Sequence, residues 1–180
     1  MKTPRIILTS SLCFLLAIAG CSKSVPQPAA EPSASPQNLN EGKRIASVDV
    51  VKATPQPLTV IAGGSGEATV RLTIQSGYHV NANPPTYSYL KATELEIAPG
   101  DGISVGQAKY PAALNKKFLF AEKPLAVYEG ETDLKVTIRA DKSAKPGERS
   151  LSAKLRVQAC DDQVCYPPGT LNLSIPVNVK

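Results

Sequence analysis

Four stretches of the sequence alternate apolar and polar residues with a period of two, and this pattern limits the possible folds more than any other feature. In residues 151–159, for example, Leu155 and Val157 alternate with Lys154 and Arg156. A strand with one buried face shows this period, whereas an amphipathic helix repeats every 3.6 residues. The four stretches are residues 68–75, 134–139, 151–159 and 171–179.

Less regular apolar runs and frequent turn residues extend the same pattern. The weaker strand candidates are residues 46–51, 58–62, 92–97 and 103–108, and pairs such as Gly63-Gly64 and Pro146-Gly147 separate the runs. Seven to nine short strands over about 135 residues, with no strong 3.6 period, are typical of a sandwich. We therefore predict an all-β fold over residues 44–180, an immunoglobulin-like antiparallel β-sandwich, with a small β-barrel as the alternative.

The N-terminus has the layout of an export signal. Lys2 and Arg5 precede an apolar run over residues 6–19, which is shorter than the roughly 20 residues of a membrane span. The ending Ile18-Ala19-Gly20-Cys21 resembles a bacterial lipobox, which implies cleavage after residues 1–20 and lipidation of Cys21. The other interpretation is a plain secreted protein. We predict a lipid-anchored protein of the cell envelope that faces the periplasm, with the choice of membrane left open.

Residues 21–43 form a different compositional segment. They are rich in Pro, Ser, Ala and Gln and have no hydrophobic period. Such a composition is typical of a semi-extended linker. We therefore predict a disordered Pro/Ser-rich tether between the lipidated cysteine and the folded domain.

Composition excludes several functional classes. The 180 residues carry a formal charge of +5, without a basic stripe interleaved with aromatic residues, so we expect no nucleic-acid binding. His79 is the sole histidine and there is no G-x-S-x-G sequence, which disfavours a serine hydrolase. A monomer is the default expectation.

Of the four cysteines, two remain available for chemistry in the exported chain. Cys13 leaves with the signal and Cys21 takes the lipid, which leaves Cys160 and Cys165 where disulfides can form. Cys160 continues the polar, even-numbered set of residues 151–159, so we expect it to face away from the main core. Four residues separate the two cysteines, and a hairpin there can bring their Cα atoms within the usual 4.4–6.8 Å. We predict a short, exposed bridge.

Spacing alone leaves the role of this pair open between a structural staple and a redox pair. Closing a ring of about six residues stabilises a fold by roughly 2 kcal/mol, against about 4.7 for a 100-residue loop. An exposed bridge is also accessible to another thiolate. A structural zinc needs four ligands, and Cys160, Cys165 and His79 are too few, so we expect neither a metal nor a cofactor.

Three segments resemble a known family in order. The most specific is Gln158-x-Cys160, followed by Cys165-Tyr166-Pro167-Pro168; residues 77–84 and residues 110–130 support it. Together they resemble the N-terminal periplasmic domain of the thiol:disulfide interchange protein DsbD, and the similarity covers roughly residues 45–180. Tyr166 thereby becomes a candidate residue near the site.

This resemblance implies an immunoglobulin-like fold with a reversible disulfide. It implies that the domain takes electrons from a thioredoxin-like domain or a membrane electron-transfer protein and passes them to periplasmic thioredoxin-fold proteins, as a component of a protein-disulfide reductase. Cys165 would form the mixed disulfide and Cys160 would resolve it. Phe118 or Phe120 would cap the pair when no partner is docked; the alternative is that both are core residues of a strand.

The sequence departs from the family pattern near the cysteines. Known members have one more residue between the cysteines, an acidic pair where Lys116 and Lys117 stand, and an aromatic residue in place of His79. Lys116, Lys117 or a protonated His79 near a sulfur would favour the thiolate, whereas Asp161 and Asp162 oppose it. A surface or strand-packed position is the other interpretation of His79.

Two functional hypotheses follow. The first is a thiol–disulfide exchange module; because the sequence ends at Lys180, without the family's membrane and thioredoxin-like domains, we expect a lipid-tethered shuttle between separate proteins. The second is a non-redox immunoglobulin-like binding or assembly domain whose disulfide is a hairpin staple. The reduction potential separates the two, because structural bridges lie below about −300 mV.

Overall fold

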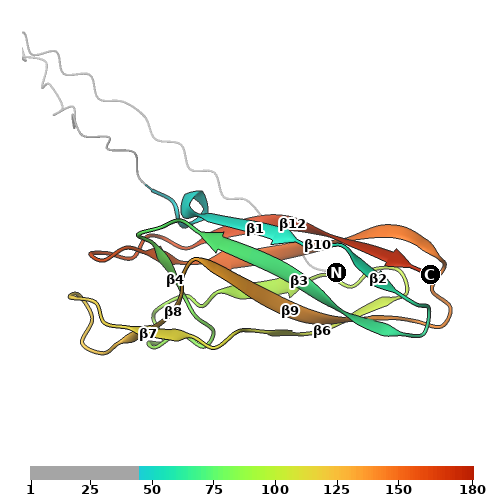
Figure 1. Ribbon diagram of the computed structural model, residues 1–180, viewed down its shortest axis with the longest axis horizontal. Helices are drawn as coiled ribbons and strands as arrows, with labels where there is room; N and C mark the ends of the chain where they lie inside the picture. The colour runs from blue at the N-terminus through green and yellow to red at the C-terminus, as the bar shows by residue number, and fades with distance from the viewer. Residues whose placement is uncertain (1–44) are drawn as a thin grey trace, which may run out of the picture. The chain divides into compact units, whose positions relative to one another are not determined.

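Residues 45–180, the part of the chain that the computed structural model describes, consist of strands joined by turns and loops (Figure 1). The predicted signal sequence, Cys21 and the linker of residues 21–43 lie outside the described residues. Among residues 45–180 no helix has the length and apolar character needed to cross a membrane. In chain order the elements are the 3₁₀ helix η1 (Ser47–Val50), β1 (Val51–Pro55), β2 (Leu58–Val60), β3 (Ser65–Ile74), β4 (His79–Asn81), β5 (Glu94–Ile97), β6 (Ile103–Lys109), β7 (Leu114–Lys116), β8 (Leu125–Tyr128), β9 (Glu131–Ala140), β10 (Gly147–Val157), β11 (Ala159–Cys160) and β12 (Gly169–Val179).

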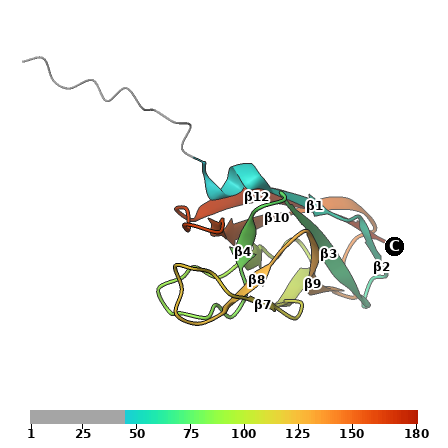
Figure 2. The ribbon, with the colours of Figure 1, turned by 60° about the vertical axis from the view of Figure 1, so that its left-hand side comes forward.

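Within these residues the strands form three four-stranded sheets. Their orders are β1-β3-β9-β6, β2-β12-β10-β5 and β11-β4-β8-β7. The first two sheets form the sandwich, and the third lies at one end of it, where β4, β8 and β7 are labelled in Figure 1 and Figure 2. The all-β prediction is confirmed. One pairing departs from the antiparallel expectation, because β2 runs parallel to β12.

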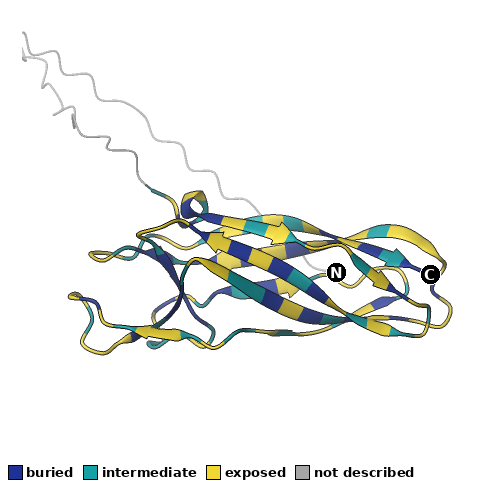
Figure 3. Cartoon of the chain, in the orientation of Figure 1, coloured by how far each residue is buried: buried dark blue, intermediate teal, exposed yellow. Residues whose placement is uncertain are grey.

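The main core lies between the first two sheets. On β10 the odd-numbered residues Leu151, Leu155 and Val157 are buried while the even-numbered ones are exposed, as the alternation predicted. They pack with buried residues of β3, β9 and β12 in one apolar cluster. The alternation is visible as buried and exposed bands along β3 and β9 in Figure 3. Each large side chain buried in this way contributes about 1.5–3 kcal/mol.

The first predicted strand, residues 46–51, is wrong over most of its length. Residues Ser47–Val50 form the helix η1, and the strand β1 begins only at Val51. The backbone N–H of Ala46 donates to Asp49 Oδ2 (3.0 Å), and that of Asp49 donates to the Ala46 carbonyl (2.9 Å). Local bonds of this kind compete with strand pairing and hold the segment in a turn.

The predicted strand of residues 151–159 is in fact two strands in two different sheets. Strand β10 ends at Val157, and β11 begins at Ala159 and pairs with β4 in the third sheet. Gln158 lies at the crossing, where its carbonyl accepts from the Asn81 N–H (3.2 Å) and its side-chain Oε1 accepts from the Lys91 N–H (2.7 Å). This crossing carries Cys160 into the small third sheet.

Candidate functional site

Cys160 and Cys165 form a disulfide across a tight hairpin. The S–S distance is 2.01 Å and the two Cα atoms are 3.9 Å apart, slightly below the range that the sequence predicted. The Asp161 N–H donates to the Val164 carbonyl (3.0 Å), and the Tyr166 N–H donates to the Ala159 carbonyl (2.8 Å). Residues 161–164, here called the cysteine loop, therefore join two backbone segments that are paired at the cysteines themselves.

Asp161 fixes the shape of the cysteine loop. Its Oδ1 accepts from the N–H groups of Gln163 and Val164, both at 2.8 Å, and its Oδ2 accepts from the Tyr166 hydroxyl at 2.5 Å. The Tyr166 hydrogen bond, followed by those from the backbone, lowers the pKa of Asp161. The same bond raises the pKa of Tyr166 to about 12. Ionised Asp161 thus holds the cysteine loop in place through these hydrogen bonds, whereas Asp162 is exposed.

The base of the hairpin is attached to the start of the domain. Ser47 is fully buried; its Oγ accepts from the Ala159 N–H (2.9 Å) and donates to the Pro167 carbonyl (2.6 Å). Gln158 Nε2 donates to the Tyr166 carbonyl at 3.2 Å. These bonds hold both arms of the hairpin on rigid backbone, so the positions of the two sulfurs are set by the fold.

The two cysteines differ in burial, and the prediction of an exposed bridge is wrong. Cys160 is 0% exposed, while Cys165 is intermediate between buried and exposed. The neighbouring Ala159 belongs to the main core cluster and Cys160 does not, although Cys160 is fully buried and pairs with His79 across β4 and β11. The sequence pattern could not show this burial, because β4 is distant from Cys160 in the sequence. An approaching thiol can therefore reach the Cys165 sulfur more easily.

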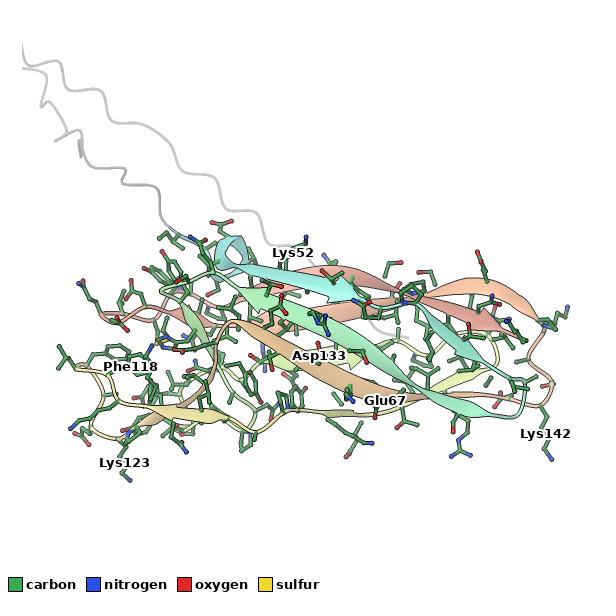
Figure 4. All side chains as sticks on the ribbon, in the orientation of Figure 1. Lys52, Glu67, Phe118, Lys123, Asp133 and Lys142 are labelled. Carbon is green, nitrogen blue, oxygen red and sulfur yellow. A yellow bond between two sulfur atoms is a disulfide. The ribbon has the colours of Figure 1, made fainter. Side chains whose placement is uncertain are left out.

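The cap loop, residues 117–124, joins β7 to β8 and lies beside the disulfide. Phe118 is 3% exposed and packs against Leu90, Leu125 and Val127 in a second apolar cluster, with Cys165 at its margin. Figure 4 shows Phe118 at the end of the domain opposite Lys142. Phe120 stacks on Phe118 with 5.4 Å between ring centroids and is 42% exposed. Neither phenylalanine lies in a strand, so Phe118 is the inner residue of the cap loop and Phe120 the outer one.

His79 lies beneath Phe118 and opposite Cys160. The two rings stack with centroids 4.1 Å apart, and His79 pairs with Cys160 across β4 and β11. Burial first, and then the nearby Lys116 charge, lower the pKa of His79 to about 4, against the smaller opposing effects of Glu129, Asp162 and Asp161. His79 is strand-packed and neutral at pH 7. This is the strand-packed position that the sequence offered as one interpretation, and a protonated His79 is disfavoured in this closed, oxidised arrangement.

Lys116 connects the cap loop to the cysteine loop. Its Nζ is 2.6 Å from Glu129 Oε1, 3.9 Å from Asp162 Oδ1 and 5.4 Å from the centroid of the Phe118 ring. The hydrogen bond to Glu129 raises the pKa of Lys116. Partly exposed ion pairs of this kind contribute at most about 1 kcal/mol, so they orient the loops more than they stabilise them. Lys117, the next residue, is exposed.

A second loop, residues 84–91, completes the site and was not identified from the sequence. Thr86 Oγ1 accepts from the Ala126 N–H (2.7 Å), and the Tyr87 hydroxyl accepts from the Lys123 N–H (3.1 Å), so this loop supports the cap loop. The Tyr-x-Tyr sequence after Pro84-Pro85 was the available signal. Beside Cys165 a cavity of about 260 Å³ opens between the loops; its lining residues are Tyr89, Leu90, Phe120, Ala121, Leu125, Gln163, Val164 and Cys165.

The buried, neutral state of His79 predicts a pH-dependent stability. Its pKa is about 4 in the folded chain and 6.5 when unperturbed, so the unfolded chain takes up the proton first as the pH falls. The contribution of His79 to the free energy of unfolding should therefore be largest above pH 6.5 and should decrease as the pH falls from 6.5 towards 4. Urea unfolding of the wild type and of His79→Phe across this window tests the prediction. A constant difference between the two proteins would contradict it.

One family model matches the chain. It is described as thiol:disulfide interchange protein DsbD, N-terminal, and matches residues 47–175, well over half of the sequence. A search of curated proteins found no match.

Among solved structures, the N-terminal periplasmic domain of ScsB from Proteus mirabilis is similar at 14% identity and a TM-score of 0.43, covering 71% of this chain and 45% of that chain. A PapD-like domain of human CEP192 is similar at 14% identity and a TM-score of 0.33, covering 83% and 98%. A family 123 glycoside hydrolase from Clostridium perfringens has 12% identity and a TM-score of 0.29, covering 73% and 28%. The chain thus spans less than half the length of the ScsB chain that it matches.

The family match includes β11, the cysteine loop and the cap loop, so it covers the disulfide and the side chains that enclose it. The chain belongs to the family of the N-terminal domain of the thiol:disulfide interchange protein DsbD.

Proposed function

We propose that this domain relays electrons between thioredoxin-fold proteins of the bacterial cell envelope through reversible opening of the Cys160–Cys165 disulfide. The family assignment supports thiol–disulfide exchange as the chemistry. The observation that carries the finer proposal is the unequal burial of the two sulfurs, with Cys165 on an apolar cavity and Cys160 fully enclosed behind it. The cell-envelope location rests on the predicted signal sequence and on Cys21, where we propose a lipid anchor.

Electrons would enter by attack on the accessible sulfur. A partner thiolate attacks Cys165 Sγ, the Cys160–Cys165 bond breaks, and its electron pair leaves with Cys160 as a thiolate. A second thiolate of the partner then attacks the partner's own sulfur in the mixed disulfide. The partner is oxidised to a disulfide, Cys165 departs as a thiolate, and this domain has gained two electrons, with protons taken from solvent.

Electrons would leave by the reverse sequence. The Cys165 thiolate attacks an acceptor disulfide, and one acceptor sulfur leaves as a thiolate. Cys160 then attacks Cys165 Sγ in the mixed disulfide, which restores the bridge and releases the second acceptor sulfur. Cys165 is thus the exchanging residue and Cys160 the resolving one, in agreement with their burial.

The surface around Cys165 suits an apolar partner. Tyr89, Phe120 and Val164 line the cavity beside Cys165 and are exposed by 70%, 42% and 49%, and Leu119 of the cap loop is exposed by 103%. Exposed large apolar side chains gathered around a reactive group are typical of a docking site. A partner that covers them would displace the cap loop and bring its own sulfur to Cys165.

The competing proposal is a non-redox binding domain with a structural disulfide. Full burial of Cys160 is the observation that favours it, because enclosed bridges are protected from exchange. This proposal keeps the apolar surface as a docking site but gives the sulfurs no chemical part in it.

Exchange with a protein thiol separates these proposals. The oxidised domain is mixed with a reduced thioredoxin, and free thiols are trapped by alkylation and counted by mass spectrometry. The relay predicts two new thiols per chain, formed at least about 10²-fold faster than with glutathione at equal thiol concentration, since docking opens the cap. A rate no greater than that of glutathione would contradict it.

A further inference from the structure

His79 is a buried polar side chain whose two ring nitrogens lack partners. It is 1% exposed, and neither Nδ1 nor Nε2 has a hydrogen-bond partner among residues 45–180. Buried polar groups are nearly always paired, and a histidine used only for packing normally donates or accepts at one nitrogen at least. An unpaired imidazole at this depth calls for an explanation.

The residue directly opposite His79 is Cys160. His79 and Cys160 are partners across the antiparallel pair β4–β11, and such partners have Cβ atoms about 4.5–5.5 Å apart on the same face of the sheet. In the oxidised chain the Cys160 sulfur is bonded to Cys165 and carries no proton. On reduction it becomes a thiol, which is a donor that a neutral imidazole can accept. Reduction would therefore place a hydrogen-bond donor on the residue opposite the unpaired ring.

Reaction of Cys160 needs such an acceptor. A thiolate, not a thiol, attacks a disulfide, and burial in apolar surroundings raises the pKa of a thiol. Cys160 is fully buried, and the next two residues, Asp161 and Asp162, are acidic. A proton that moves from Cys160 to the neighbouring imidazole yields an adjacent thiolate and imidazolium, so that the site gains no net charge.

We propose that His79 is the proton acceptor for Cys160 when Cys160 resolves the mixed disulfide on Cys165. The Cys160 thiol gives its proton to a neutral His79 nitrogen, and the resulting thiolate attacks Cys165 Sγ. The Cys160–Cys165 bond forms, the bond from Cys165 to the acceptor breaks, and its electron pair leaves on the acceptor sulfur. His79 then returns the proton to that thiolate or to solvent. This inference rests on the proposed exchange function.

The charged groups that face His79 act on this transfer in both directions. Lys116, from β7, opposes a charged imidazole, while Glu129, after β8, and Asp161 and Asp162, from the cysteine loop, favour it. Burial dominates and keeps the ring neutral in the closed state, which is the form that accepts a proton. Phe118 covers one face of the ring through the 4.1 Å stack.

Two phases of one reaction isolate the resolving step. The reduced chain reacts with dithiobis(nitrobenzoate); the first coloured thiolate released reports attack by Cys165, and the second reports resolution by Cys160. His79→Phe keeps an aromatic ring against Phe118 and should slow the second phase by about 10²-fold near neutral pH. The rate of the first phase should stay within about threefold of the wild-type rate. The deficit should shrink as the pH rises, because hydroxide then removes the Cys160 proton. A second phase within twofold of the wild type at every pH would overturn the proposal.

A titration without turnover provides the second readout. In Cys165→Ala the ultraviolet absorbance of the Cys160 thiolate is followed against pH, with and without His79→Phe. Loss of His79 should raise the midpoint by at least about one pH unit, and His79→Gln, which keeps polarity but not basicity, should do the same. An unchanged midpoint in both variants would overturn the inference. If the wild type resolves with the small disulfide but does not exchange with thioredoxin, the proposed relay fails while the role of His79 stands.

Discussion

Replacing Phe118 with alanine should make the disulfide far easier to reduce. Phe118 is 3% exposed, stacks on His79 and packs in the cluster that has Cys165 at its margin. Deletion of a buried phenylalanine side chain typically lowers the free energy of unfolding by about 3–5 kcal/mol. Part of this loss destabilises the closed form of the cap loop relative to the open form. Each 1.4 kcal/mol removed from the closed form raises the open-to-closed ratio about tenfold. Reduction by dithiothreitol should therefore accelerate by about 10–10²-fold.

Phe120→Ala is the matched control for this change. Its ring lies on the same loop but is 42% exposed, so its removal should change the reduction rate by no more than about threefold. The rates are measured by quenching with an alkylating reagent, on chains whose folded state is verified by circular dichroism. A folded Phe118→Ala chain that is reduced at the wild-type rate would show that the cap loop does not shield the sulfurs.

The two cysteines should give opposite outcomes when each is replaced. Cys165→Ala removes the accessible sulfur, so exchange with a thioredoxin-fold protein should fall by at least about 10³-fold. Cys160→Ala keeps that sulfur but lacks the resolving thiol, so a mixed disulfide through Cys165 should accumulate. Non-reducing electrophoresis and mass spectrometry of the adduct measure both outcomes.

Neither variant should unfold, which makes the comparison informative. The ring that the disulfide closes is short, so its loss costs about 2 kcal/mol, less than the total stability of about 5–15 kcal/mol of a typical domain. The main core cluster does not include either cysteine. A mixed disulfide that accumulates on Cys160 in Cys165→Ala would reverse the assigned roles.

The long strands of the two large sheets could be predicted from the sequence because each has one buried face and one solvent-exposed face. Strands β3, β9 and β10 bury every second residue over most of their length, and β12 does so from Ile175 to Val179, which is the pattern that a period of two reports. The third sheet escaped prediction because β4 is buried at all three residues and β8 is at least half-buried throughout. Short strands covered on both faces show no alternation, and no local rule separates them from other apolar segments.

The sequence singled out several side chains that lie around the disulfide, but it indicated neither their burial nor the loop of residues 84–91. The spacing of Cys160 and Cys165 predicted that they could be bridged, and the family resemblance singled out His79, Phe118 and Lys116. Burial depends on chain segments some 40–80 positions apart in the sequence, which meet only after the strand crossing at Gln158. For the same reason the sequence left open whether His79 is charged, and burial favours the neutral form of this strand-packed residue.

The reduction potential of the Cys160–Cys165 bridge tests the central claim most directly. The domain, expressed from about residue 41, is equilibrated with glutathione and dithiothreitol buffers, and free thiols are counted after acid quenching. An electron relay predicts a potential between roughly −200 and −280 mV, beside those of glutaredoxins and thioredoxin. A potential well below about −300 mV, with slow exchange even in Phe118→Ala, would make the bridge a structural staple and contradict the relay.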